Sequence, residues 1–479
     1  MRAIRKLSEL IDVHGRFPLT PSYDLLLKNG TLATDYGVFK ADVGVKDGKI
    51  AFLGDFEVTS SGKVREVIDL HGKYLLPGGV DPHCHFGEPG MAYREDFGTG
   101  TRSAAAGGIT TIVEMPLSLP PTDTPEHFHL KLALAREKAV VDFSLWGGLV
   151  PDNQEEIPKL FELGVYAFKA FMCHASTYPQ VTDGELLQGM KVIAGLGGLV
   201  GVHAENDGII KYCTARLRAS GRVDGKAHAE ARPPIAEYEA ISRALLLAQE
   251  AGVDLHILHM GLASGARLIQ EAKKSGIPVT VETCPHYLTL TEEELARLGP
   301  YAKCNPPLRS RENVEALWEY LFNGTLDMVV SDHAPYPAED RNKGWQEIFA
   351  APSGIAGVQT ALPLLLSEGF HKRGLSLVRL VQLISTNPAK RFKLYPQKGT
   401  LRIGSDADLV IIDLDAPWKV KREDLFYKNP QTPFEGWELK GKVLKTFVRG
   451  RKVFDEGKIL VEPGYGKWIA LGSPGGPVP

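Results

Sequence analysis

The stretch Gly78-Gly79-Val80-Asp81-Pro82-His83-Cys84-His85-Phe86-Gly87-Glu88-Pro89-Gly90 decides how this chain is organised. Residues 80–85 are predicted to end a buried strand, because the Gly-Glu-Pro-Gly that follows breaks a strand into a loop. Side chains two apart on a strand point to the same face, so His83 and His85 point the same way. Imidazole nitrogen is a preferred ligand of zinc and its neighbours. Histidines at this spacing also occur as packed core residues, and the rest of the chain must distinguish the two cases.

Strand-like apolar runs alternate with amphipathic stretches along the centre of the chain. The expected strands are residues 80–85, 110–115, 143–149, 165–172, 199–204, 255–260, 279–283 and 328–332. The expected helices include 124–139, 185–195, 236–251 and 263–275, and two more follow near 357–367 and 375–385. Apolar strands separated by helices indicate a parallel sheet buried on both faces. The number of strands predicts an α/β fold, a (β/α)8 TIM barrel, with its chemistry at the carboxyl ends of the strands.

Both ends of the chain show short apolar runs with tight turns. Asn29-Gly30 and Asp47-Gly48 are typical hairpin turns, because both residue types tolerate positive φ. Similar runs return at residues 408–413 and 443–454, so the ends are predicted to form one small β-sandwich. The expected organisation is an N-terminal extension (1–22), a first sandwich part (23–76), the barrel (77–395), a second sandwich part (396–460) and a C-terminal tail (461–479).

Composition excludes several function classes. The 55 basic and 58 acidic residues nearly balance and form no basic block, which argues against nucleic acid or an anionic membrane as a partner. No apolar run reaches the roughly 18 residues of a transmembrane helix, and residues 1–18 do not resemble a signal peptide. The five cysteines are scattered, which favours reduced thiols and a cytoplasmic location.

Polar residues stand at the ends of five of the predicted strands. They are His83, His85, Lys169, His203, His259 and Asp332. Each has a structural alternative, such as an exposed face for the lysine, but chance burial does not place polar groups at strand ends repeatedly. Two adjacent metal ions need a bridging ligand and together make hydroxide from water at neutral pH. A desolvated lysine that reacts with carbon dioxide gives a carbamate with one oxygen for each metal, and Asp332 can act as general base.

With these residues in place, the chain resembles the cyclic-amidohydrolase branch of the amidohydrolase superfamily from about Tyr23 to Lys458. The motifs are His83-Cys-His85, Lys169, Val202-His-Ala-Glu205, His256-Ile-Leu-His259 and Ser331-Asp-His333. The resemblance implies that His83, His85 and Asp332 hold a buried metal, that His203 and His259 hold an exposed one, and that carboxylated Lys169 bridges them. It also implies zinc, or manganese, cobalt or iron, and a homo-oligomer, either a tetramer or a dimer.

The branch contains allantoinases, hydantoinases, dihydropyrimidinases and dihydroorotases. Dihydroorotases typically carry an arginine that grips the substrate carboxylate where this chain has Gly87, which argues against that activity. The segments Glu114-Met-Pro-Leu-Ser118 and Glu282-Thr-Cys-Pro-His-Tyr287 resemble allantoinases, whereas Lys343-Gly-Trp345 is similar to L-hydantoinases. The substrate contacts that the resemblance implies are at Asn305 (through its backbone), Cys304, Ser353 and Gly87. Cys304 also fits a small core residue.

The resemblance implies a hydrolase whose metal-bridging hydroxide opens a cyclic ureide or hydantoin, a non-peptide cyclic amide. Allantoin, a substrate of purine breakdown, is preferred, with allantoate as the product. The alternatives are an L-type hydantoinase or dihydropyrimidinase, then a dihydroorotase. A non-catalytic scaffold of the same fold is a remote alternative, because all six ligand positions are filled. The choice between allantoin and hydantoins is left open by the sequence.

Overall fold

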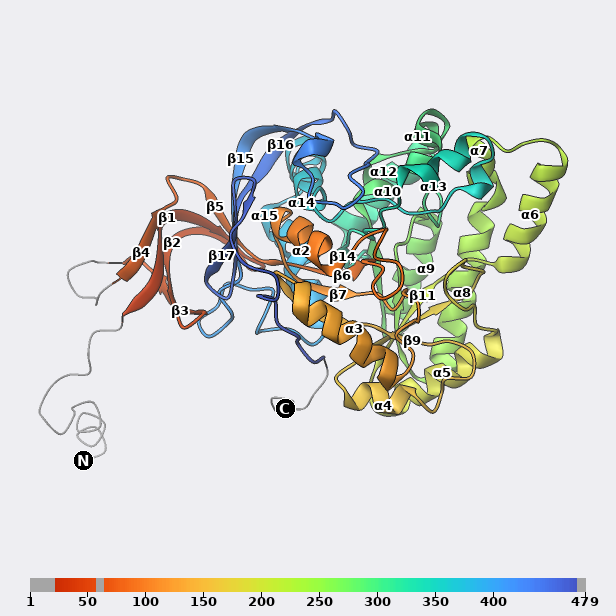
Figure 1. Ribbon diagram of the computed structural model, residues 1–479, viewed down its shortest axis with the longest axis horizontal. Helices are drawn as coiled ribbons and strands as arrows, with labels where there is room; N and C mark the ends of the chain where they lie inside the picture. The colour runs from red at the N-terminus through yellow and green to blue at the C-terminus, as the bar shows by residue number, and fades with distance from the viewer. Residues whose placement is uncertain (1–21, 57–63, 472–479) are drawn as a thin grey trace, which may run out of the picture.

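The computed structural model describes residues 22–56 and 64–471, which form a helix-covered barrel beside a β-sheet (Figure 1). The predicted N-terminal extension up to residue 21 and residues 472–479 of the predicted tail lie outside the described residues. Within the described ranges, no helix combines the length and the apolar character that crossing a membrane would require.

The barrel strands match the predicted runs closely and are all parallel. They are β6 (Gly79–Cys84), β7 (Ile109–Glu114), β8 (Asp142–Leu145), β9 (Gly147–Gly148), β10 (Ala167–Phe171), β11 (Leu199–His203), β12 (Asp254–Ile257), β13 (Val279–Thr283) and β14 (Met328–Val329). Hydrogen bonds join β6-β7-β8 and β9 to β14 in chain order. β8 and β9 are two parts of the one strand predicted at 143–149, and a parallel bridge between Cys84 and His333 closes the ring. The predicted (β/α)8 barrel is confirmed.

Helices follow most of the barrel strands and surround them. The longer ones are α2 (Phe97–Ala106), α3 (Pro125–Lys138), α5 (Asp183–Leu196), α6 (Asp207–Ala219), α8 (Pro234–Ala251), α9 (Ala263–Lys274) and α12 (Arg311–Phe322). The shorter ones are α4 (Ile157–Glu162), α7 (Gly225–Ala231), α10 (Pro285–Thr289), α11 (Glu292–Leu298), α13 (Ala338–Asn342), α14 (Ala361–Leu364), α15 (Leu377–Val381) and α16 (Asn387–Arg391). The helices expected near 357–367 and 375–385 begin later and continue as π-helical turns at Leu365–His371 and Gln382–Thr386.

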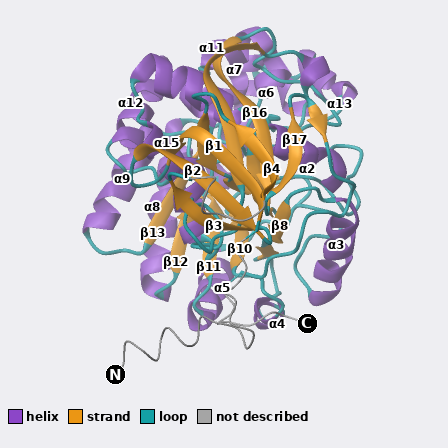
Figure 2. Cartoon of the chain, turned by 90° about the vertical axis from the view of Figure 1, so that its left-hand side faces the viewer, coloured by secondary structure: helices purple, strands orange, loops and turns teal. Residues whose placement is uncertain are grey.

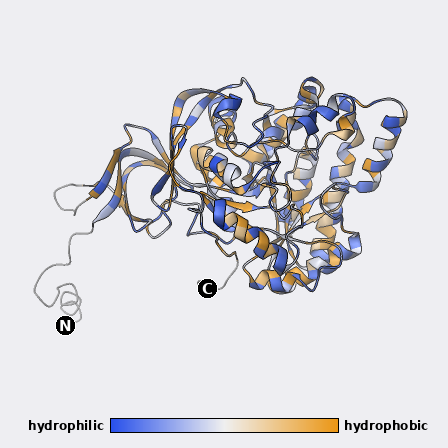
Figure 3. Cartoon of the chain, viewed as in Figure 1, coloured by the Kyte–Doolittle hydropathy of each residue, from blue (hydrophilic) through white to orange (hydrophobic). Residues whose placement is uncertain are grey.

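The surrounding helices mix hydrophilic and hydrophobic residues (Figure 3). In α3, Phe128, Leu132 and Ala135 are buried at helical spacing and face the barrel core. The start of α5 is fixed by a capping box, in which Thr182 and Glu185 satisfy each other's backbone N–H groups. Periodicity thus predicted α3, α5, α8 and α9, whereas α2, α6 and α12 were not among the expected helices.

Strands from both chain ends form a single nine-stranded sheet, which faces the viewer in Figure 2. Its N-terminal strands are β1 (Tyr23–Ala33), β2 (Val38–Lys46), β3 (Lys49–Gly54), β4 (Val64–Asp69) and β5 (Tyr74–Pro77). Its C-terminal strands are β15 (Leu409–Lys419), β16 (Glu438–Val448), β17 (Arg451–Asp455) and β18 (Lys458–Ile459). The two sets meet where β15 pairs antiparallel with β5, while β1 pairs parallel with β4 and β5. Its core includes Leu27, Val43, Leu75, Leu409 and Phe447.

One of the two predicted hairpin turns is wrong. Asp47 and Gly48, with φ of 50° and 75°, do join β2 to β3. Asn29-Gly30 instead lies inside β1, where the register against β2 shifts between Leu27 and Gly30. Asn29 has the positive φ that a turn would need, 59°, but its backbone N–H and side-chain amide are held by carboxylates of neighbouring strands, and β1 runs on to Ala33. The same local signal therefore gave a bulge.

The described part of the predicted C-terminal tail packs against the barrel. The Phe143 N–H donates to the Lys467 carbonyl at 2.9 Å, and the Ile469 N–H donates to the Phe143 carbonyl at 2.8 Å. Trp468 contacts the rings of Phe128 and Phe143. Residues 461–471 thus extend the outside of the barrel at β8, a contact that the sequence pattern did not suggest.

Candidate metal centre

The structure brings the six predicted ligand residues to one end of the barrel. They lie within or just beyond β6, β10, β11, β12 and β14, and none is more than 7% exposed. A cavity of about 540 Å³ opens above them. His85, Lys169 and Asp332 line it together with His203 and His259, while His83 lies beneath and is fully buried.

The first ligand group consists of His83, His85 and Asp332. The Asp332 Oδ1 atom lies 3.1 Å from His83 Nε2 and 3.2 Å from His85 Nε2. Burial lowers the pKa of His85 to about 3, so its imidazole is neutral and can donate a lone pair. Burial opposes the charge of Asp332, but the two histidines hold its pKa well below the usual range. Two imidazoles and a carboxylate form a donor set suited to a divalent transition metal.

A second group forms around Lys169. His203 Nδ1 lies 2.9 Å from His259 Nε2, and the Lys169 Nζ atom lies 3.4 Å from His83 Nε2. Lys169 therefore lies beside the first group, and burial together with its charge lowers the pKa of His203 and His259 in the second. Burial lowers the pKa of Lys169 to about 8, and no carboxylate forms an ion pair with it among the residues of 22–56 and 64–471. A buried amine without a counter-ion fits carboxylation by carbon dioxide.

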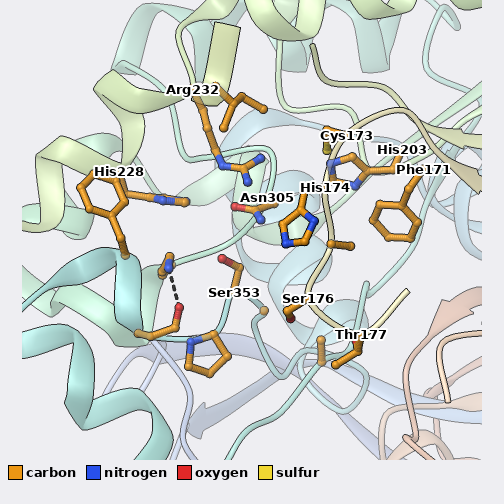
Figure 4. Close-up of a pocket in the computed structure, with 18 of the residues that line it drawn as sticks. Phe171, Cys173, His174, Ser176, Thr177, His203, His228, Arg232, Asn305 and Ser353 are labelled. Carbon is orange, nitrogen blue, oxygen red and sulfur yellow. Dashed lines mark hydrogen bonds between the residues drawn. The ribbon is translucent and has the colours of Figure 1, made fainter. Parts of the chain in front are cut away.

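Cys173, His203 and Glu205 also lie close enough to hold an ion. In this group Glu205 already accepts from His203 Nε2 at 2.7 Å and forms an ion pair with Arg232. Burial raises the pKa of the Cys173 thiol to about 12. Because Glu205 is neutralised and the thiol holds its proton, we assign this group to fixing the ring of His203, which leaves Nδ1 facing His259. Figure 4 shows His203 and Cys173 beside the cavity, with Arg232 nearby.

Glu282, on β13, connects the two ligand groups from below, and the sequence pattern had given it no role. Its Oε1 atom contacts His83 Nδ1 and accepts from the His259 backbone N–H at 2.9 Å, while Oε2 lies 3.0 Å from His256 Nε2. The carboxylate thereby fixes the tautomer of His83 so that Nε2 faces the cavity. A carboxylate beside the Thr-Cys-Pro motif, at the buried end of an apolar strand, was the available signal.

Two ligand residues adopt a backbone conformation that few residues other than glycine adopt. His259 has a φ of 35° and Asp332 a φ of 45°. Such conformations cost roughly 1–3 kcal/mol each and persist where the surrounding structure imposes them. Both residues stand just beyond the ends of their strands, where the backbone turns to aim the side chain at the centre.

The predicted substrate contacts divide into two pairs. Asn305 and Ser353 line the cavity (Figure 4). Cys304 is 1% exposed, and its carbonyl accepts from His228 Nε2 at 2.9 Å, which fits the core alternative. Gly87 is not among the cavity-lining residues; its φ is 72°, and a Cβ there would lie 2.8 Å from the Met91 carbonyl oxygen.

Two of three further buried histidines are held by side-chain or backbone partners. His256 is held between Thr280 and Glu282. His333 Nδ1 accepts from the Gly357 N–H at 3.1 Å, so Nε2 carries the proton towards Glu95, 3.3 Å away. His286 is buried, and burial lowers its pKa to about 4. The cavity walls that sequence reasoning missed include Arg94, Arg232, Lys303 and Tyr336.

Comparisons with known proteins place the chain in one family. Residues 74–453 match the amidohydrolase family. The chain is 45% identical to an allantoinase of Rubrobacter xylanophilus over 92% of this chain and 96% of the relative. It is 41% identical to an L-hydantoinase of Paenarthrobacter aurescens over 93% of this chain and 98% of the relative.

Solved structures agree with this placement. An L-hydantoinase (dihydropyrimidinase) from Arthrobacter aurescens superimposes with a TM-score of 0.91 at 41% identity, covering 94% of this chain and all of the relative. A D-hydantoinase superimposes with a TM-score of 0.88 at 34% identity, covering 93% of this chain and 98% of the relative. With the ligand geometry, the family match and these relatives taken together, the chain belongs to the amidohydrolase family.

Proposed function

We propose that this protein is a dinuclear metal-dependent hydrolase that opens the ring of a cyclic ureide or hydantoin, with allantoin as the preferred substrate and allantoate as the product. The carrying observation is the convergence of four histidines, a lysine and an aspartate at the carboxyl ends of the barrel strands, beneath a cavity of about 540 Å³. The similarity to several allantoinases, at 37–45% identity, supports the choice of substrate.

The ligand roles follow the two geometric groups. His83, His85 and Asp332 would hold one ion, His203 and His259 the other, and carboxylated Lys169 would contribute one oxygen to each. When bound, the two ions supply a water molecule activated at neutral pH and polarise the amide carbonyl. Zinc is the preferred metal, and imidazole and carboxylate donors also suit manganese, cobalt or iron.

Lys169 supplies the bridging group by a simple addition. Its neutral Nζ attacks the carbon of carbon dioxide, a C–N bond forms, and one N–H proton leaves to solvent. The product is a carbamate anion with two oxygens. Lowering of the lysine pKa to about 8 by burial supports this step, because only the unprotonated amine is nucleophilic.

Asp332 is placed to move the proton during ring opening. Its carboxylate, held ionised by His83 and His85, takes the proton of the attacking water and passes it to the ring nitrogen as the C–N bond breaks. Asn305 and Ser353, on the cavity wall, are positioned to hold the ring amide against this carboxylate.

A hydantoinase of the L type is the second candidate. The superposition on an L-hydantoinase, with a TM-score of 0.91, supports this candidate. The proposed metal centre would act on the ring amide of a hydantoin in the same way as on that of allantoin. The two candidate substrates differ in the substituent on the ring, so the cavity residues that contact this substituent would distinguish them.

Turnover of racemic allantoin, 5-substituted hydantoins, dihydrouracil and dihydroorotate, with metal and bicarbonate supplied, tests the proposal. We expect allantoin to have the highest kcat/KM. A larger value for the hydantoins would select the second candidate. Absence of turnover with every ring, in protein that contains its full metal complement, would sink both candidates and favour a non-catalytic scaffold.

A matched variant separates the metal chemistry from binding. Lys169→Ala is expected to abolish turnover and to lower the metal content measured by elemental analysis, because the bridging ligand is lost. The Lys131→Ala variant removes another buried lysine, one that is paired with Glu114 away from the centre, and is expected to retain its metal. Full activity of Lys169→Ala would refute the dinuclear centre.

A further inference from the structure

Arg94 is a buried cation on the wall of the active-site cavity. It belongs to the loop that follows β6, the strand that carries His83 and His85, and it lines the same cavity as His85 and Asp332. Only 6% of the residue is exposed. A guanidinium remains charged at every physiological pH, so this site carries a permanent positive charge in a desolvated place.

The Arg94 guanidinium has almost no hydrogen-bond partners. Among the residues that the structure describes, its buried Nε–H has no partner, and its side-chain hydrogen bond runs from Nη1 to the Met91 sulfur at 3.5 Å. Within residues 22–56 and 64–471, no carboxylate lies within 4.0 Å of it. One face of the group is stacked on Tyr336, with the guanidinium carbon 3.9 Å from the ring centroid. This stacking covers one face of the guanidinium with an aromatic ring, but it provides no acceptor for the N–H groups at its edge.

The other two arginines of the cavity wall, and Lys211, are paired with carboxylates, while Lys303 donates to the Ala351 carbonyl and Lys169 belongs to the candidate metal centre. Arg232 pairs with Glu205, Arg218 Nε lies 2.7 Å from Glu347, and Lys211 Nζ lies 2.6 Å from Asp207. A buried charge without a partner is costly, and it persists where something else completes it. The contrast between Arg94 and its neighbours points to a partner that arrives with the substrate.

We propose that Arg94 grips a planar oxygen acceptor on the ring substituent of the substrate, either the carbonyl of a ureido group or a carboxylate. The proposal rests on the proposed function, because it names what the ring carries. Guanidinium N–H groups form a rigid fork that matches such acceptors, often with two parallel hydrogen bonds. An aliphatic substituent would leave the buried fork unsatisfied and would be disfavoured.

Position 87 shows why this role falls to Arg94. The backbone at Gly87 has a φ of 72°, which residues with a side chain rarely adopt. The Cβ of an arginine there would also lie 2.8 Å from the Met91 carbonyl oxygen. The loop of this chain therefore cannot accommodate an arginine at position 87. Arg94 reaches the cavity from further along the same loop, so an acceptor-binding cation is present although the expected position is a glycine.

The test compares three rings that differ only in the substituent at the same carbon: allantoin (ureido), hydantoin-5-acetic acid (carboxylate) and 5-ethylhydantoin (aliphatic). The measured quantity is the ratio of kcat/KM for each acceptor-bearing ring to that for 5-ethylhydantoin. In the Arg94→Met variant we expect this ratio to fall by about 10- to 100-fold, as for loss of a charge-assisted hydrogen bond. The change should lie mainly in KM.

Two further variants sharpen the result. Arg94→Lys keeps the charge without the fork, so the ratio should recover partly for the carboxylate and less for the ureido group. Arg218→Met removes another cation from the same cavity wall, one that is already paired with Glu347, and should change the ratio by less than about twofold. Whichever ratio, that of the ureido ring or that of the carboxylate ring, falls more in Arg94→Met identifies the group that Arg94 binds.

A ratio that is the same in Arg94→Met and in the wild type overturns the inference, whether all three rates fall together or none does. If the wild type opens none of the three rings, the proposed function fails, and calorimetric binding of the same three compounds decides the inference instead. Equal affinity ratios in the wild type and in Arg94→Met then overturn it, and a fall of the acceptor ratio supports it.

Discussion

Lys169 shows how burial alone can prepare a residue for its chemistry. An ordinary lysine, with a pKa of 10.5, is about 0.03% unprotonated at pH 7, whereas a pKa of about 8 gives about 10%. The apolar strand around it removes solvent, and the carboxylates of Asp332 and Glu282 offset only part of that effect. The same environment that makes a charged lysine unfavourable makes a neutral, nucleophilic one available.

This shift predicts how restoration of the enzyme depends on pH. In metal-depleted protein given metal at constant dissolved carbon dioxide, the rate of reactivation should rise about tenfold per unit below pH 8 and level off above it, because the unprotonated fraction saturates at the pKa of about 8. Stopped assays after rapid mixing measure the rate. A rate that keeps rising up to pH 10 would show that the lysine titrates normally.

Glu282 offers a second test at the scale of single residues. Glu282→Gln should weaken metal affinity by about 10- to 100-fold, because His83 loses the carboxylate that orients its ring. Competition with a chromophoric chelator measures the affinity. Thr280→Val is the control: it removes the other partner of His256, at 2.7 Å, without touching His83, and should stay within about threefold of the wild type. Equal affinities in Glu282→Gln and the control would refute the role.

At the scale of the element, strand β11 carries His203 to the centre and packs tightly inside the barrel. Gly201 lies on this strand, and a Cβ there would meet the Trp146 ring at 2.7 Å. The large indole and the missing side chain are complementary, as small and large residues alternate in a filled barrel. The glycine is thus part of the packing that sets the position of β11.

Gly201→Ala should therefore lower the free energy of unfolding by about 1–3 kcal/mol, the usual cost of overpacking a core. Thermal unfolding followed by circular dichroism measures the effect. Gly195→Ala is the matched control, since Gly195 lies on the exposed side of α5 with nothing within 4 Å of its Cβ position. The control should be neutral or stabilising by about 0.5–1 kcal/mol. Equal stability of Gly201→Ala and the wild type would contradict the packing argument.

At the scale of the whole molecule, a buried charge cluster joins the sheet to the barrel. Lys398 Nζ lies 2.6 Å from Asp142 Oδ2 on the barrel and 2.8 Å from Asp408 Oδ2 before β15. Arg449, after β16, also pairs with Asp142. The charges come from segments far apart in sequence and are almost fully buried, so their pairing depends on correct docking of the two parts.

Lys398→Met should destabilise the protein by about 3–5 kcal/mol, because it leaves the buried Asp408 carboxylate without its counter-ion. Urea unfolding at pH 7 measures the effect. Lys49→Met is the control. Lys49 pairs at 2.8 Å with Asp406, a carboxylate that lies 3.0 Å from Lys398 Nζ as well, but the Lys49 side chain is 53% exposed, so the change should be below about 1 kcal/mol. Equal losses in the two variants would show that burial of the cluster contributes nothing.

The predicted strands are confirmed, and the predicted ligand residues converge in the structure, for related reasons. A strand in a parallel barrel is buried on both faces, so its sequence is a short apolar run, and a polar residue at its end stands out. Residues 279–283 were predicted with both bounds of β13, and Lys169 was visible because its neighbours are apolar. The Asn29-Gly30 turn failed because a local signal for positive φ serves a bulge as well as a hairpin.

The sequence by itself determined the barrel, the joining of the two chain ends, and which side chains gather at the strand ends, because these follow from periodicity and strand direction. Only the tertiary structure decided that Glu282 fixes His83, that Asp332 and His259 take positive φ, that Cys304 faces the core, and that Arg94 reaches the cavity without a partner. Those features depend on contacts between segments distant in the chain. Periodicity records which face of an element is buried, and it carries no information on what that face meets.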